Sequence, residues 1–391
     1  MEIRKLTPYA LQGLAVGVVV GFLVLMFLKP GEPPGDRTAI TIKEAKTTPP
    51  SKNHAGDGAV TYASAVERAA PSVVNIYTTK IIRRDPHPLL DDPSFQRFFG
   101  GSPLGPREKL ENSLGSGVII SEQGYVLTNN HVIADADEIL VALRDGRSAS
   151  AQLVGSDPET DIAVLKVPTD HLQSIVIGES ENLRVGDVVL AIGNPFGVGQ
   201  TVTMGIVSAT GRNQLGISTY ENFIQTDAAI NPGNSGGALV DTLGNLMGIN
   251  TAIFSRTGGS QGIGFAIPAH LAKAVMEQII KYGRPIRGWL GVETQNITPD
   301  LAESFNLGDQ TGVVIAGVVP SGPADKIGLR AGDVITEING KAVDNASSLI
   351  NYVATLPPDS DVKLKIHREG RSEDVTARIG ERPRPPSMPT R

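Results

Sequence analysis

The chain has 391 residues, of which 40% are hydrophobic and 19% are charged, so it is long enough for two or three globular domains. Its net charge of −6 offers no basic surface to nucleic acid, and its lack of cysteine excludes thiol catalysis, disulfides and cysteine-based zinc sites. The sequence carries no cluster of metal ligands and no phosphate-binding loop, so we expect no cofactor and no metal.

An uncharged run from Leu6 to Leu28 follows Arg4 and Lys5 near the start of the chain. About 20 apolar residues span a bilayer as a helix, and preceding basic residues favour a cytoplasmic N-terminus. Residues 1–28 are therefore predicted to form a cytoplasmic N-terminus and a transmembrane signal anchor. A cleaved signal peptide is the alternative, although the run is longer than a signal peptide's apolar core and no A-x-A site ends it.

Residues 29–60 are rich in Pro, Gly, Thr, Lys and Asp without apolar periodicity, which is typical of a flexible linker. From about residue 72 to 268, within a domain predicted at 61–284, short β-rich runs alternate with turn signals, and this pattern predicts an all-β barrel or sandwich. The predicted strands are SVVNIYTTK, GSGVIIS, YVLTNNHV, IAVLKV, DVVLAIGN, TVTMGIVSA, ALVDTLGNLMGINTAI and GIGFAIP.

One long segment interrupts the β pattern. Residues 81–113 are rich in proline, charged residues and aromatics, which predicts a long loop. Within it Phe95, Phe98 and Phe99 would share one face of a short helical turn, and could pack on their own domain or on another subunit.

A helix and a second domain are predicted after the strands. The run AHLAKAVMEQIIKYG ends at Gly283 and predicts an amphipathic helix. Residues 285–380 then predict a small domain of strands and helical turns, and the Pro-rich residues 381–391 predict a disordered tail. The apolar positions at helical spacing in the helix are Leu271, Val275, Ile279 and Ile280.

A candidate nucleophile, Ser235, lies in the glycine-rich turn NPGNSGGALV. A serine hydroxyl needs an adjacent base that a third group orients. His131 ends an apolar strand at a turn, and Asp161 directly precedes the apolar run IAVLKV. Taken alone, Asp161 could equally be a strand-edge residue without a catalytic role. The chain order His131, Asp161, Ser235 is, however, that of the chymotrypsin-type triad.

The motifs TNNHV, DIAVLKV and GNSGGALV, at these separations, resemble the HtrA family of chymotrypsin-fold serine endopeptidases. With one membrane anchor, one protease domain and one C-terminal PDZ-like domain, the chain looks most like the DegS branch of that family. The resemblance covers about residues 62–380. It implies an all-β chymotrypsin-like double β-barrel at 61–284, a small α+β PDZ domain at 285–380, and a homotrimer.

The resemblance also gives the glycine-rich turn a role. Gly233, Asn234 and Ser235 would form an oxyanion hole, in which the N–H groups of Gly233 and Ser235 face the oxygen that becomes negative. His131 would accept the Ser235 proton and return it to the leaving amine, while Asp161 fixes the tautomer of the imidazole.

Two departures from trypsin bear on specificity and activation. Ala229 and Ile230 lie where trypsin has its charged pocket, so an uncharged S1 pocket is predicted, with cleavage after small aliphatic residues such as Val or Ala. Asn234 replaces the aspartate that pairs with a newly cut N-terminus, so activation is expected to act through loops.

The run RGWLGV resembles the carboxylate-binding loop of HtrA-family PDZ domains, where a peptide adds a strand and backbone N–H groups hold its terminal carboxylate. By the same resemblance, Arg212 in the ATGR motif of the loop 209–222 would relay the state of the PDZ domain to the active site; a solvated surface arginine is the alternative. The implied carboxylate loop is Trp289, Leu290, Gly291 and Val292.

DegS-like proteins provide the functional expectation. The chain would be an inner-membrane, single-pass serine endopeptidase with its protease and PDZ domains in the periplasm. It would sense C-terminal peptides of misfolded or unassembled outer-membrane proteins and cut a membrane-bound anti-sigma factor in an envelope stress response. A general periplasmic quality-control protease or chaperone is the alternative. The anchor disfavours that alternative, because tethering restricts the substrates within reach.

Overall fold

The structure is a computed structural model that describes residues 41–44, 61–83, 108–195, 199–253, 259–304 and 311–383. The predicted anchor and Phe95, Phe98 and Phe99 lie outside these ranges. Every helix within them is too short or too polar to span a bilayer. All of the described residues belong to one compact unit.

A seven-stranded antiparallel sheet forms the first barrel, with strand order β6-β5-β2-β3-β4-β8-β7. Alternate residues of these strands point inward, as strand geometry requires, and Ile76, Ile119 and Val126 lie in the resulting core. The strands are β2 (Val73–Arg83), β3 (Glu108–Ile119), β4 (Tyr125–Thr128), β5 (Glu138–Ala142), β6 (Ser148–Ser150), β7 (Gln152–Asp157) and β8 (Ile162–Lys166).

An eight-stranded sheet forms the second barrel, in the order β1-β9-β14-β13-β10-β11-β12-β15. A further pairing of β14 with β15 closes six of these strands into a ring around the buried Leu239 and Ile230. The strands are β1 (Lys43–Glu44), β9 (Val176–Ile177), β10 (Val188–Gly193), β11 (Thr201–Arg212), β12 (Phe223–Thr226), β13 (Ala238–Val240), β14 (Leu246–Ile253) and β15 (Gly264–Pro268).

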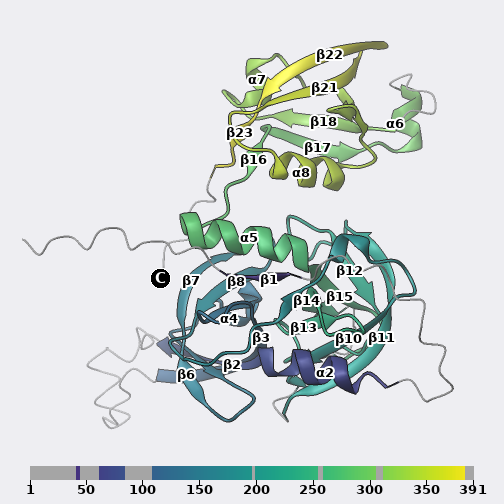
Figure 1. Cartoon of the computed structure of the whole chain (residues 1–391). Helices are drawn as coiled ribbons and strands as arrows, with labels where there is room; N and C mark the ends of the chain where they lie inside the picture. The colour runs from purple at the N-terminus through teal and green to yellow at the C-terminus, as the bar shows by residue number, and fades with distance from the viewer. Residues whose placement is uncertain are drawn as a thin grey trace, which may run out of the picture. The chain divides into compact units, whose positions relative to one another are not determined.

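Helix α5 (Ala269–Tyr282) confirms the predicted amphipathic helix and contacts strands of both barrels, β7 and β8 as well as β14 and β15 (Figure 1). It ends where predicted, because Gly283 adopts a left-handed φ of 76° and its N–H donates to Ile279 O over 2.7 Å. Of the apolar positions noted in the sequence, Ile279 is fully buried, and Leu271 and Val275 are partly buried, pack against the core and line a pocket.

The predicted loop 81–113 was wrong at both ends. Strand β2 continues to Arg83 and β3 begins at Glu108, so the two strands form a long ribbon that flanks the central part of the segment. Opposite charges face each other across this ribbon, with Lys80 opposite Glu111. Such pairs stabilise a sheet without the apolar alternation by which strands were recognised.

A small α+β domain follows the barrels, with strand order β17-β18-β19-β21-β22 and an added β20, beside the two-stranded pair β16-β23 (Figure 1). This confirms the predicted fold class of a double β-barrel followed by a PDZ domain. Its strands are β16 (Gly288–Trp289), β17 (Val292–Asn296), β18 (Val313–Val318), β19 (Val334–Ile338), β20 (Lys341–Ala342), β21 (Asp361–Arg368), β22 (Arg371–Arg378) and β23 (Gly380–Glu381). The remaining α-helices in the described ranges are α2 (Ala63–Ala69), α4 (Asn130–Ile133), α6 (Pro299–Ser304), α7 (Pro323–Lys326) and α8 (Ala346–Thr355), and two 3-10 helices span Ala70–Ser72 and Ser180–Asn182.

Candidate active site

The structure brings His131 and Asp161 into direct contact. His131 lies in the short helix α4 that follows β4, and Asp161 directly precedes β8, the neighbour of β4 in the sheet. The Nδ1 atom of His131 lies 2.7 Å from Asp161 Oδ2, and the main-chain N–H of His131 donates to Asp161 Oδ1 over 2.9 Å. A proton held on Nδ1 leaves Nε2 free to accept another, as a general base requires.

Asp161 is held in an unusual backbone conformation. Its φ is 59°, in the left-handed region that costs energy for a residue with a side chain. Its carbonyl oxygen accepts from the N–H of Asn130 and from the side-chain amide of Asn129, over 3.1 and 3.0 Å. These bonds tie the turn before β8 to the turn that carries His131, so the carboxylate is oriented by its backbone as well as by its partners.

Thr251 is a further partner of Asp161 that the sequence did not single out. Its hydroxyl, in β14 of the second barrel, donates to Asp161 Oδ2 over 2.6 Å. A threonine in the middle of an apolar strand carries no distinctive motif. Only the docking of the two barrels brings it to the carboxylate.

Ser235 belongs to the second barrel and approaches the same place. Its hydroxyl donates to the main-chain oxygen of Thr251 over 3.2 Å, and within the described residues it has no hydrogen bond to His131. The serine hydroxyl must therefore leave this carbonyl before His131 can accept its proton. Hydrogen bonds of this kind often tighten only when substrate is bound.

The turn around Ser235 leaves two N–H groups free. Asn234 N–H donates to Asn231 O over 2.9 Å, whereas the N–H groups of Gly233 and Ser235 have no acceptor in the described part of the chain. Gly233 adopts a φ of 100°, which a residue with a side chain rarely reaches. Of the three residues in the predicted oxyanion hole, the geometry thus favours Gly233 and Ser235 as donors. The N–H of Asn234 instead stabilises the turn through its bond to Asn231 O.

The two predicted S1 residues differ in their surroundings. Ile230 is fully buried in the second barrel, and a Cβ built on Gly264 would lie 2.8 Å from its Cδ1 atom. Ala229 is half-buried, and its carbonyl oxygen accepts from the Thr203 hydroxyl over 2.8 Å. Neither side chain carries a charge, so neither could form an ion pair with a lysine or arginine side chain of a substrate.

Arg212 lies at the end of β11, not inside the loop predicted at 209–222. Its Nε donates to Gln225 Oε1 of the neighbouring strand over 2.8 Å. The loop therefore starts after Arg212, and the described contacts of this side chain lie within the second barrel.

The predicted carboxylate loop forms the passage from β16 to β17. Gly291 adopts a φ of 78°, and Leu290 is buried. The carbonyl oxygens of Leu290 and Gly291 accept from Ala324 and Val319 over 2.9 Å each, whereas the N–H groups of these two residues have no acceptor among the described residues. Free N–H groups on a rigid loop beside a sheet edge are what a terminal carboxylate requires.

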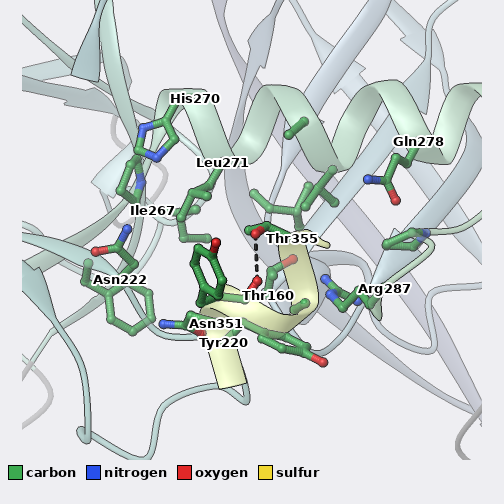
Figure 2. Close-up of a pocket in the computed structure, with 18 of the residues that line it drawn as sticks. Thr160, Tyr220, Asn222, Ile267, His270, Leu271, Gln278, Arg287, Asn351 and Thr355 are labelled. Carbon is green, nitrogen blue, oxygen red and sulfur yellow. Dashed lines mark hydrogen bonds between the residues drawn. The ribbon is translucent and has the colours of Figure 1, made fainter. Parts of the chain in front are cut away.

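A pocket of about 520 Å³ lies apart from these residues and contains none of the three triad side chains. Figure 2 shows Ile267 and Leu271 at this pocket together with Tyr220 and Asn351. At its edge the main-chain N–H of His270 donates to Ser180 Oγ over 3.1 Å, and His270 Nδ1 lies 2.8 Å from the same oxygen. The Nδ1 atom of a neutral His270 can accept a hydrogen bond from the Ser180 hydroxyl, whereas a protonated imidazole cannot accept one.

This contact predicts a pH effect on stability. Burial lowers the pKa of His270, and the nearby Glu181 opposes that shift in part. With the folded-state pKa below the unfolded value, the unfolded chain takes up the proton first, so stability falls as pH decreases through about 6.5. We expect His270→Gln to lose less melting temperature than the unchanged protein between about pH 7.5 and about pH 5.5, measured by calorimetry. Equal losses would contradict this effect.

No group of three or more His, Asp or Glu side chains that could hold a metal ion occurs in the described ranges. The chemistry available at the site is that of a hydroxyl, an imidazole and a carboxylate beside two free N–H groups. This set can form and stabilise a tetrahedral intermediate at an acyl carbon.

Comparisons with known proteins agree with this arrangement. The Trypsin-like peptidase domain family matches residues 115–249, and the PDZ domain family matches residues 288–379. A "Probable periplasmic serine endoprotease DegP-like" of Pseudomonas putida (strain W619) is 48% identical over 336 residues, covering 82% of this chain and 70% of the relative. A protein of the same description from Halomonas elongata is 46% identical over 337 residues, covering 82% and 71%.

Solved structures extend the similarity to three dimensions. "HtrA-type protease AlgW with decapeptide" is 60% identical and has a TM-score of 0.71, covering 83% of this chain and 100% of its own. The serine endoprotease from Yersinia pestis is 42% identical with a TM-score of 0.61, covering 84% and 100%.

Proposed function

Because this chain belongs to the HtrA family of periplasmic serine endoproteases, we propose that it is a membrane-anchored member whose PDZ domain controls its activity. The controlling ligand is the C-terminus of a misfolded or unassembled outer-membrane protein. The regulated reaction is a single cut in a membrane-bound anti-sigma factor. Ser235, His131 and Asp161 are the proposed nucleophile, base and orienting carboxylate.

The observation that carries this proposal is the hydrogen bonding of the loop after Arg212 to the PDZ domain. The side-chain amide of Asn351, in α8, donates to Glu221 O over 2.6 Å. The Glu221 carboxylate is itself buried and accepts from the N–H groups of Leu215 and Ile217, over 2.6 Å each. One side chain thus sets the shape of the loop, and the PDZ contact sets its position.

A second contact joins the PDZ domain to the segment before Asp161. Arg287 pairs with the buried Asp157, and Arg382 donates to Glu159 Oε1 over 2.7 Å. The Arg287 guanidinium also lies 4.4 Å from the centroid of the Tyr220 ring, and burial raises the pKa of Tyr220 to about 12. Both contacts end on segments that lead into the candidate site, which supports coupling between a PDZ ligand and catalysis.

The carboxylate loop and the pocket beside it support a peptide C-terminus as the proposed ligand. A pocket beside Leu290 and Gly291 is walled by Leu349 and Val353 of α8, which suits an apolar terminal side chain. The HtrA-type protease AlgW has been solved with a decapeptide and with a tripeptide, so relatives 56–60% identical to this chain bind short peptides. This supports peptide recognition by the present chain.

Membrane attachment and assembly complete the proposal. The uncharged run from Leu6 to Leu28 is the proposed inner-membrane anchor. This arrangement would leave the protease and PDZ domains in the periplasm, the compartment given for the two DegP-like relatives. A homotrimer is proposed from the resemblance to the DegS branch. Arg212 is proposed as the relay residue on the same ground.

A peptide titration tests the regulatory role. We expect a peptide with a free carboxylate and an apolar terminal residue to raise cleavage of a Val- or Ala-containing substrate by about 5- to 150-fold, the usual range of allosteric coupling. The same peptide as a C-terminal amide is the matched control and should have little effect, since it cannot present a carboxylate to the N–H groups of the loop. Equal stimulation by both peptides, or rapid degradation of casein without any peptide, would contradict the proposal.

A further inference from the structure

We infer that Ser116, in the first barrel, is a positioning residue. Its hydroxyl holds the turn Gly233–Gly236 of the second barrel, here called the oxyanion turn, in its catalytic conformation. The inference rests on the proposed assignment of the Gly233 and Ser235 N–H groups as the oxyanion donors. Ser116 lies in β3 and has no exposed surface. Among the described residues it has no hydrogen bond to His131 or Asp161, and nothing in its sequence context, GSGVII, marks it as part of the site.

The hydroxyl and the main-chain N–H of Ser116 both bond to the turn that carries Ser235. Its Oγ donates to Gly233 O over 2.7 Å and accepts from Asn194 N–H over 3.0 Å. Its N–H donates to Ser235 O over 2.8 Å, and its carbonyl oxygen accepts from the Thr128 hydroxyl over 2.7 Å. One residue therefore binds the turn on both sides of Asn234.

Hydrogen bonds fix three successive peptide planes of this turn, and Ser116 supplies a bond to two of them. In the plane between Gly233 and Asn234, the oxygen accepts from Ser116 Oγ and the N–H donates to Asn231 O. In the plane between Ser235 and Gly236, the oxygen accepts from Ser116 N–H and the N–H donates to Asn250 O. The intervening plane is held at its oxygen by Gly237 N–H, which leaves the Ser235 N–H free to face a substrate.

The hydroxyl acts where the turn is otherwise loosest. Gly233 has no side chain, so its N–H direction depends on the peptide planes that flank its Cα atom. Close packing already constrains the far side of the turn, since a Cβ on Gly236 would lie 2.1 Å from Ser116 O. On the near side the plane after Gly233 depends on two hydrogen bonds, and Ser116 supplies one of them.

Loss of this hydroxyl has a specific consequence. Gly233 O would be left without its donor in a buried place, and it would regain one most readily by rotating away from Ser116. The Gly233 N–H belongs to the preceding peptide plane, which the Gly233 Cα joins to this one, so the rotation would release the restraint that keeps that N–H where an oxyanion develops. The effect would fall on the transition state, where the charge forms, and would spare ground-state binding of substrate.

The test compares Ser116→Ala with Ser180→Ala in the full-length protein. Both substitutions remove a buried hydroxyl that makes two hydrogen bonds, but within the described residues both bonds of the Ser180 hydroxyl are with His270. We expect Ser116→Ala to lower kcat by about 10- to 100-fold with KM changed less than about threefold, below the 10²- to 10³-fold cost of deleting an oxyanion donor. Ser180→Ala should leave both constants within about twofold.

A transition-state analogue separates positioning from stability. The Ki of a peptidyl boronate, whose tetrahedral adduct at Ser235 places an oxygen in the hole, should rise in Ser116→Ala by the factor lost from kcat. Ser116→Cys, with a weaker donor of similar size, should lie between Ser116→Ala and the unchanged protein. The inference is overturned if kcat and boronate affinity match those of Ser180→Ala, or if both Ser116 variants fail to fold. All rates are measured with the activating peptide present, and failure of the unchanged protein to cleave peptides under that condition would instead refute the proposed roles of Ser235 and the oxyanion donors.

Discussion

Ser235→Ala is expected to lower kcat for peptide hydrolysis on the order of 10⁶-fold, to the residual rate that substrate binding alone supports. Among the described residues, the Ser235 hydroxyl is the nucleophile that lies near both His131 and the two free N–H groups. Removing it deletes the acyl-enzyme step and leaves the turn intact, because the hydrogen bonds that hold Ser235 use its main chain. The rate of a fluorogenic peptide measures this loss.

Two controls define that result. The double variant with Ser235→Ala and His131→Ala should be no slower than either single variant, since residues that act as one unit are not additive. Melting temperature and peptide affinity at the PDZ domain should be unchanged in Ser235→Ala. Turnover above about one hundredth of the original rate would contradict the role of Ser235.

Asp161→Asn is expected to lower kcat by about 10⁴-fold. The carboxylate accepts two bonds from His131, one from the imidazole and one from the main chain, and a third from the Thr251 hydroxyl. An asparagine can present its amide N–H₂ to Nδ1, which would move the imidazole proton to Nε2 and remove the base that Ser235 needs.

Thr251→Val provides the matched comparison for Asp161→Asn. It removes one hydrogen bond from the same carboxylate and keeps the negative charge, so a loss of about tenfold or less is expected. Stopped assays of peptide cleavage at several pH values measure both variants. Asp161→Asn with activity similar to that of Thr251→Val would show that the carboxylate does not set the tautomer.

The sequence predicted the fold class and helix α5 because strong local patterns carried them. Strands such as IAVLKV are buried on both sides and read as continuous apolar runs, and α5 ends at a glycine that adopts the left-handed region. Strands β5 and β12 were not predicted, because each is only four or five residues long and contains a run of at most four apolar residues. The ends of the 81–113 segment were missed since cross-strand charge pairs leave no such pattern.

The candidate triad could be proposed from chain order, but its supporting residues could not. Thr251 and Ser116 carry ordinary side chains in ordinary strands, and their partners are 90 and 117 residues away in the chain. Their bonds cross between the two barrels, so they depend on a docking geometry that local sequence does not encode. The left-handed conformation of Asp161 was likewise invisible, because aspartate occurs in many turns.

The division of the site between two barrels also governs when activity can begin during biosynthesis. His131 and Asp161 come from the first barrel, whereas Ser235 and Thr251 belong to the second and are made later. Domains form from the N-terminus onward as a chain is made, at about 5–20 residues per second. A nascent chain that has finished only its first barrel therefore has a base without a nucleophile. Such a chain cannot cleave the export machinery or its own unfolded part until the strands of the second barrel have been exported and folded.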